Sequence, residues 1–178
     1  MKKIMLIAAL MLISIGVFAQ GKVAIGANAG VALYGNSYNP FGLGAKLQYE
    51  FVENVRAEVA YNYWFEKENQ GLMDVDLSFQ YLVPLSETIN LYPLAGINLG
   101  MTHGKEFKEF FGGQESIFGF QAGLGIEFYL NECIKANVDA KYQHNKKTKS
   151  YDIIGLGTAE LEMKYNGPVI QVGIAYVF

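Results

Sequence analysis

Two histidines, His103 and His144, are the first candidates for chemistry in this chain. A catalytic His must reach the group that it deprotonates, usually a hydroxyl or thiol within hydrogen-bond distance. Lys105 and Lys146 stand two residues after the histidines, where a local nucleophile would be expected. The nearest hydroxyls belong to predicted loops: Ser116, Thr148 and Ser150. We therefore expect no catalytic site.

Metal and nucleotide chemistry have no stronger basis in the sequence. His103 could join Glu106 or Glu109, but two or three ligands on one predicted loop do not make a metal site. Cys133 is the single Cys, so no internal disulfide can form. The glycines between residues 119 and 125 alternate with apolar residues, as in a strand, and not as in a phosphate-binding loop. We expect no metal and no cofactor.

The composition limits the class of protein further. The 178 residues include 14 Lys plus Arg against 17 Asp plus Glu, so the formal net charge is −3. Nucleic-acid binding needs clustered basic residues, so this balance argues against a nucleic-acid partner. With 51% hydrophobic and 17% charged residues, the chain is not a disordered one.

The first residues have the pattern of an export signal. Lys2 and Lys3 precede a nearly unbroken apolar run over residues 4–17, and Val17 and Ala19 provide small residues before Gln20. The run is short for a membrane span, which needs about 20 residues. Residues 1–19 are therefore predicted to be a signal peptide, and residues 20–178 a single exported domain.

The exported part alternates with a period of two. Between Phe41 and Phe51 the odd positions are apolar or aromatic, and the even positions are Gly, Lys, Gln or Glu. Strict alternation predicts a strand with one apolar face. Pro93 lacks a backbone donor, so we expect a bulge there. Eight segments follow the pattern: 23–33, 41–51, 55–65, 75–83, 89–99, 118–128, 134–142 and 170–178.

The connections alternate in length. Three are short, at residues 52–54, 84–88 and 130–133, and four are long, at residues 34–40, 66–71, 102–116 and 144–168. Short turns at one end and long loops at the other are typical of outer-membrane barrels. The fold class predicted is all-β, an eight-stranded antiparallel up-and-down barrel with both termini at the short-turn end.

The sizes of the side chains decide which face points outward. Eight strands enclose a space barely wide enough for side chains, whereas the apolar face is rich in Phe, Tyr, Leu and Ile. That face must point outward, toward lipid, and the barrel is predicted to be transmembrane. The aromatic residues also gather near both strand ends, as interfacial girdles do.

At the C-terminus, Ile174, Tyr176 and the final Phe178 alternate toward a terminal aromatic residue. Together with the barrel pattern, this resembles the small outer-membrane barrels of Gram-negative bacteria, such as OmpX and the membrane domain of OmpA. The resemblance implies an integral protein of the cell outer membrane, in contact with membrane lipid and lipopolysaccharide. It also implies that the barrel-assembly machinery reads these C-terminal residues. Gln20 directly after Ala19 resembles exported proteins of Bacteroidetes.

The inward face is predicted to be ionic. Its basic and acidic residues nearly cancel, and buried charges are tolerated when they are paired and hydrogen-bonded. We expect a polar network that closes the barrel; the alternative is a narrow ion path, which would make the protein a small passive, porin-like channel. Lys22 is also expected on the inward face. The predicted network is Lys46, Glu50, Arg56, Glu58, Asp74, Asp76, Glu127, Lys135, Asp139 and Lys141.

Function is expected outside the membrane. Before Pro168 the lipid-facing phase turns polar, so the last strand should leave the bilayer there and pair with residues 144–154. We expect a structural or adhesive surface protein that binds lipopolysaccharide and a protein ligand, with a channel as the alternative. A lipid-modifying enzyme is the third alternative, because a few small barrels have that activity. The candidate binding residues are Phe107, Phe110, Phe111, Lys146, Lys147 and Lys149.

Overall fold

The computed structural model describes residues 21–34, 39–67, 70–103, 116–153 and 157–178, and these residues form nine strands. The side chains of residues 66–67, 70, 102–103, 147–153 and 157–164 lie outside this description. The strands are β1 (Lys22–Ala32), β2 (Phe41–Val52), β3 (Val55–Lys67), β4 (Gln70–Tyr81), β5 (Val83–Pro84), β6 (Ile89–His103), β7 (Ser116–Tyr129), β8 (Ile134–Ile153) and β9 (Gly157–Val177).

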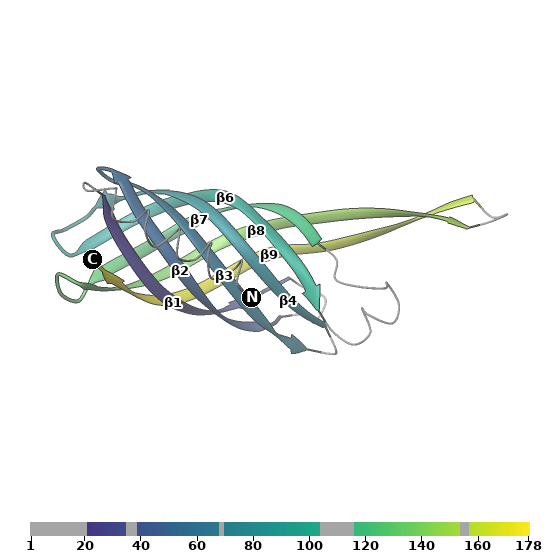
Figure 1. Cartoon of the computed structure of the whole chain (residues 1–178), viewed down its shortest axis with the longest axis horizontal. Helices are drawn as coiled ribbons and strands as arrows, with labels where there is room; N and C mark the ends of the chain where they lie inside the picture. Colours follow the sequence, from purple (N-terminus) through teal and green to yellow (C-terminus); the bar gives the residue numbers. More distant parts are fainter. Residues whose placement is uncertain (1–20, 35–38, 68–69, 104–115, 154–156) are drawn as a thin grey trace, which may run out of the picture.

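The strands close into a barrel. Each strand pairs antiparallel with its neighbours, β1 pairs with β9, and β4 pairs directly with β6. The two-residue strand β5 only prolongs β4 along β6, so the closed ring has eight strands. Figure 1 shows them tilted around the barrel axis. The predicted all-β, eight-stranded antiparallel barrel is confirmed. No helix of the described residues is long and apolar enough to cross a membrane.

Pro93 interrupts the sheet without a bulge. On the two sides of the interruption, Gln80 pairs with Leu94 and Val83 pairs with Leu91, which is one continuous register. The missing donor of Pro93 therefore opens a gap in the ladder and does not insert an extra residue. At this gap the Leu82 N–H donates to the carbonyl of Asn54 at 2.7 Å. The expected bulge at Pro93 is wrong, whereas the expected continuation of the fourth strand to Val83 is confirmed, because β5 carries the same register past a gap at Leu82.

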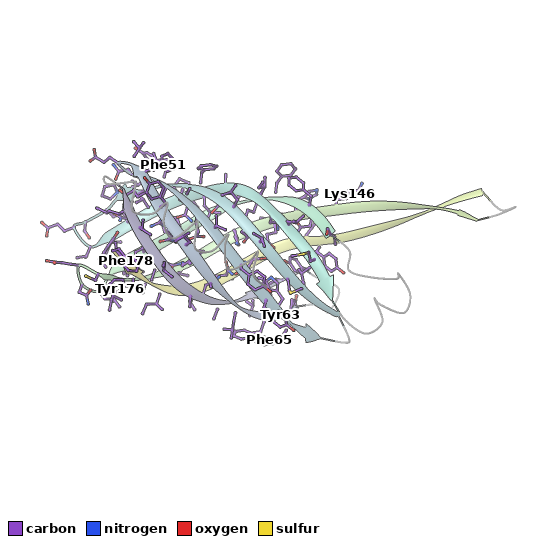
Figure 2. The ribbon with its side chains drawn as sticks, in the orientation of Figure 1. Phe51, Tyr63, Phe65, Lys146, Tyr176 and Phe178 are labelled. Carbon is purple, nitrogen blue, oxygen red and sulfur yellow. The ribbon has the colours of Figure 1, made fainter. Side chains whose placement is uncertain are left out.

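The outward face is apolar and has two aromatic girdles. At the short-turn end, the Tyr176 and Phe178 rings lie 5.0 Å apart, and Phe51 lies at the same end (Figure 2). At the long-loop end, the Tyr63 and Phe65 rings meet edge to face, with their centres 5.6 Å apart. Side chains that point away from the barrel at these two heights suit the two interfaces of a bilayer.

The last two strands run beyond the barrel. β8 pairs with β7 only as far as Asn145, and β9 pairs with β1 only as far as Val169. Beyond these points Lys146–Ile153 and Gly157–Lys164 pair only with each other. We call this two-stranded segment the ribbon. It projects from the long-loop end of the barrel, as Figure 1 shows. The predicted extension of the last strand past Pro168 is confirmed.

Candidate functional site

The first of two polar networks in the lumen centres on Glu127, which is fully buried. Arg56 and Lys135 donate to the same carboxylate oxygen, at 2.7 and 3.1 Å, and Asn90 donates to the other at 3.0 Å. Arg56 also donates to Gln80 at 2.7 Å. These contacts join β3, β4, β6, β7 and β8, so Glu127 links several strands across the lumen near the short-turn end.

This turn-end network extends toward the middle of the barrel. The Arg56 guanidinium lies 5.0 Å from the centre of the Tyr92 ring, and the Tyr92 hydroxyl donates to Asp139. Asn137 donates to Asp139 at 2.8 Å and accepts from Lys46 at 2.7 Å. Lys46 lies 3.9 Å from Glu58, which also accepts from Gln48 at 2.6 Å. The network thus holds as many basic as acidic side chains, and its charges balance.

The second, loop-end network is more acidic. Asn62 and the Trp64 indole donate to the two oxygens of Asp74, at 2.6 and 2.7 Å. Lys141 donates to one oxygen of Asp76, and Asn62 also approaches that oxygen at 3.3 Å. Within the described residues, Lys141 is the one basic group in direct contact with this pair of carboxylates. The loop-end network therefore holds two carboxyl groups against one ammonium group.

Apolar side chains cover both ends of these networks. Toward the long loops, Trp64 packs with Leu72 and Val169, all at most 2% exposed. Toward the short turns, Tyr92 packs with Leu82 and Leu94. Sequence reasoning assigned polar residues to the lumen and missed these apolar ones. Their position in the inward phase of each strand was the signal that could have identified them.

The predicted interior residues occupy three environments. Eight are buried: Lys46, Arg56, Asp74, Asp76, Glu127, Lys135, Asp139 and Lys141. The Glu58 side chain is 12% exposed and pairs with Lys46. Glu50 is half-buried at the short-turn rim, opposite Lys22 in the register. Lys22 itself shares the inward phase of β1 but is exposed. Because it is the first residue of β1, it extends past the lumen into solvent.

The outer candidates are only partly described. Lys146 is exposed where the ribbon leaves the barrel (Figure 2). The backbones of Lys147 and Lys149 lie in β8, opposite Met163 and Leu161, and their side chains lie outside the described residues. The predicted loop residues Phe107, Phe110 and Phe111 also lie outside them.

The candidates for chemistry do not converge in the described part. His144 is exposed in β8, paired with Phe120 of β7 and Asn166 of β9. His103 is the last residue of β6, and its side chain lies outside the described residues. Cys133 is an exposed free thiol in a short turn. Among the residues with a described placement, no group of three or more His, Cys, Asp or Glu side chains could hold a metal ion.

The C-terminal residues point outward along β9. Ile174, Tyr176 and Phe178 are exposed on the lipid-facing side, and Phe178 donates its backbone N–H to the carbonyl of Val23 at 2.8 Å. This contact fastens the chain end to β1 at the seam where the barrel closes. The final aromatic residue thus stays exposed on the closed barrel.

Several solved structures have the same barrel architecture. Neisserial surface protein A is 14% identical with a TM-score of 0.62, covering 89% of this chain and 97% of that one. OprG from Pseudomonas aeruginosa is 16% identical with a TM-score of 0.63, covering 89% and 95%. Ail, the attachment invasion locus protein of Yersinia pestis, is 18% identical with a TM-score of 0.51, covering 89% and 97%. At these identities the likeness shows the fold alone.

A sequence-family comparison extends this result to the family. A search of curated proteins finds no significant match to the chain. Residues 5–178, however, match the family model of the outer membrane protein beta-barrel domain. The match covers nearly the whole chain and agrees with the closed barrel, its apolar exterior and its aromatic girdles. The chain therefore belongs to the outer membrane protein beta-barrel family and is an integral β-barrel of the bacterial outer membrane.

Proposed function

We propose that this barrel is a non-enzymatic surface protein that contacts anionic glycans outside the cell through its ribbon. In this proposal the lumen is closed, the short turns face the periplasm and the ribbon projects outward. The projection of Lys146–Ile153 and Gly157–Lys164 beyond every other described strand is the observation that supports it most. Strands that continue so far into water serve no purpose in crossing a bilayer, which needs about 9–11 residues.

Basic residues at the base of the ribbon favour an anionic ligand. Lys146 and Lys164 are cross-strand partners, and Lys147 and Lys149 follow on β8. Two lysines directly opposite each other bring two positive charges close together, and an anionic group can contact both. Ail of Yersinia pestis has been solved in complex with the heparin analogue sucrose octasulfate. Lipopolysaccharide phosphates and sulfated saccharides share this chemistry, namely closely spaced anionic groups.

Binding to immobilised lipopolysaccharide and to immobilised heparin tests this proposal. We expect the purified barrel in nanodiscs to bind at least one surface, and a K146Q/K147Q/K149Q variant to lose about tenfold or more in affinity. The two surfaces distinguish a membrane glycolipid from a foreign sulfated glycan. K22Q is the matched control, because Lys22 is exposed at the opposite end of the barrel.

A shortened barrel provides the second arm of the test. Replacing residues 146–164 by an Asn-Gly turn joins Asn145 to Tyr165, which are already cross-strand partners. We expect this variant to fold and to lose binding. Binding that survives both the shortened ribbon and the lysine substitutions would refute the ribbon's role. A surface function would then have to depend on a protein ligand that binds another loop.

The enzymatic alternative has its own measurement. We expect the mass spectrum of lipid A from cells to be the same with the wild-type protein, with H103A, with H144A and without the protein. A lipid species that depends on the protein and disappears in H103A or H144A would replace a surface function by lipid modification.

The C-terminal residues are proposed to direct assembly. In F178A, loss of the exposed terminal ring should slow insertion by the assembly machinery without changing the stability of the folded barrel. The measurement is the fraction of heat-modifiable protein in cells against its unfolding midpoint after purification.

A further inference from the structure

Two amide oxygens in the lumen have no hydrogen-bond partner and lie side by side. Asn98 on β6 and Asn145 on β8 are 1% and 3% exposed, and neither Oδ1 accepts a hydrogen bond from any described group. Between them lies Gly119 of β7, which pairs with both residues in the register. A Cβ at Gly119 would lie 2.4 Å from the Asn98 Oδ1 and 1.7 Å from the Asn145 Oδ1. Both oxygens therefore occupy the space above this glycine.

Asp76, Asn98, Gly119 and Asn145 form one row of cross-strand partners from β4 to β8, and this row also contains a carboxylate oxygen. Asp76 of β4 is the cross-strand partner of Asn98 and is 1% exposed. Its Oδ2 accepts from Lys141, whereas its Oδ1 has no partner among the described residues. The row from β4 to β8 thus presents three buried oxygens without a donor. Leaving such groups unpaired in a buried site is unfavourable.

The charges near this row indicate the sign of the missing partner. The loop-end network contains Asp74 and Asp76 against Lys141 alone, and Asp74 accepts only from the neutral groups of Asn62 and Trp64. Ionisation of both carboxyl groups would leave one negative charge in excess, which is costly in a buried site. A single positive charge would neutralise it, whereas a divalent ion would reverse the imbalance.

We propose that Asp76, Asn98 and Asn145 form a lumenal binding site for a monovalent alkali cation. Carboxylate and amide oxygens replace the hydration shell of such an ion, as carbonyl oxygens do in ion-selective filters. The ion links β4, β6 and β8 across Gly119, so it stabilises the barrel near its loop end. The site lies inside the lumen and is independent of the ribbon and of its ligand.

The test compares the unfolding midpoint of the barrel in NaCl and in choline chloride. Both salts are used at about 0.15 M, so that screening is equal, and unfolding is followed by loss of the heat-modifiable gel form. We expect Na⁺ to raise the midpoint of the wild type by about 3–6 °C relative to choline. Equal midpoints in the two salts overturn the proposal.

Substitution of one ligand separates specific binding from a general salt effect. N98L removes an oxygen, keeps the number of side-chain heavy atoms and the branching at Cγ, and disrupts no described hydrogen bond, so the variant should fold. We expect it to be at least as stable as the wild type in choline and to show no response to Na⁺. G100A is the control on the same strand, because its methyl meets nothing closer than 3.5 Å, and it should keep the response. A Na⁺ response that persists in N98L overturns the proposal.

Diffraction from crystals grown in RbCl gives a direct readout. We expect an anomalous peak next to Gly119, within reach of Asn98 and Asn145. Density for a water molecule without an anomalous signal would show that the three oxygens are satisfied by solvent and would also overturn the proposal.

Discussion

At the scale of single residues, Glu127 has the largest set of charged partners in the described lumen. Arg56 and Lys135 both lie within 3.1 Å of one of its oxygens, and all three side chains are at most 5% exposed. Charge-assisted hydrogen bonds of this kind are short and strong. They are also sensitive, because removing one partner leaves the other charge buried and uncompensated.

R56L should therefore destabilise the barrel by about 3–5 kcal/mol. Trp64 is the only Trp and is fully buried, so its fluorescence reports unfolding in urea. K22Q, at an exposed position, should change the free energy of unfolding by no more than about 0.5 kcal/mol. Equal stability of R56L and the wild type would mean that Glu127 does not depend on Arg56.

The second prediction at this scale concerns residues that face the lipid. L47R places a charge in the middle of β2 on the outward face and should cost about 2–4 kcal/mol, whereas V52R at the end of β2 should cost about 0–1 kcal/mol. Urea unfolding in lipid vesicles measures both. A reversed order would contradict the depth assigned to these residues.

The alternation of apolar and polar residues was sufficient to predict whether most side chains face the lipid or the lumen, but not which side chains they contact. The inward phase identified Arg56 and Glu127, yet 71 positions separate them, and only the register of the closed barrel brings them together. Trp64 shares the phase of Asn62 and was missed because the lumen was expected to be polar. The meeting of Asn98 and Asn145 over Gly119 also depends on register, which no local pattern specifies.

At the scale of elements, the point where β9 leaves the barrel could be predicted from Pro168, because polar residues occupy the lipid-facing phase before it. The pairing of residues 146–153 with 157–164 follows from the same change. Pro93 could not be interpreted as well, because a missing donor is compatible with either a bulge or a gap. The structure has the gap, since the register is the same on both sides.

Hydrogen exchange should locate the end of the barrel. Amides of β8 up to Asn145 are in the closed sheet, whereas those from Lys146 onward belong to a ribbon with two open edges. Isolated two-stranded ribbons are marginally stable in water, so local opening exposes their amides. Mass spectrometry should detect protection at least tenfold lower for peptides within 146–164 than for peptides within 134–145. Equal protection would indicate that a further strand covers the ribbon.

At the scale of the whole molecule, the proposed function combines a closed lumen with a ribbon outside the cell. The turn-end network is balanced, the loop-end network is proposed to gain a cation, and the cluster of Trp64, Leu72 and Val169 covers the latter. An ion crossing the barrel would have to displace both paired charges and apolar side chains. In the proposed function the barrel holds the ribbon at the membrane surface, and the lumen stabilises the fold.

Planar-bilayer conductance of the pure monomer tests this account most directly. We predict no steady conductance for the wild type, and measurable conductance for W64G/L72G, in which the apolar cover of the lumen is removed. A stable, ohmic conductance of the wild type, at the level of the opened variant, would contradict the closed lumen and identify the protein as a channel.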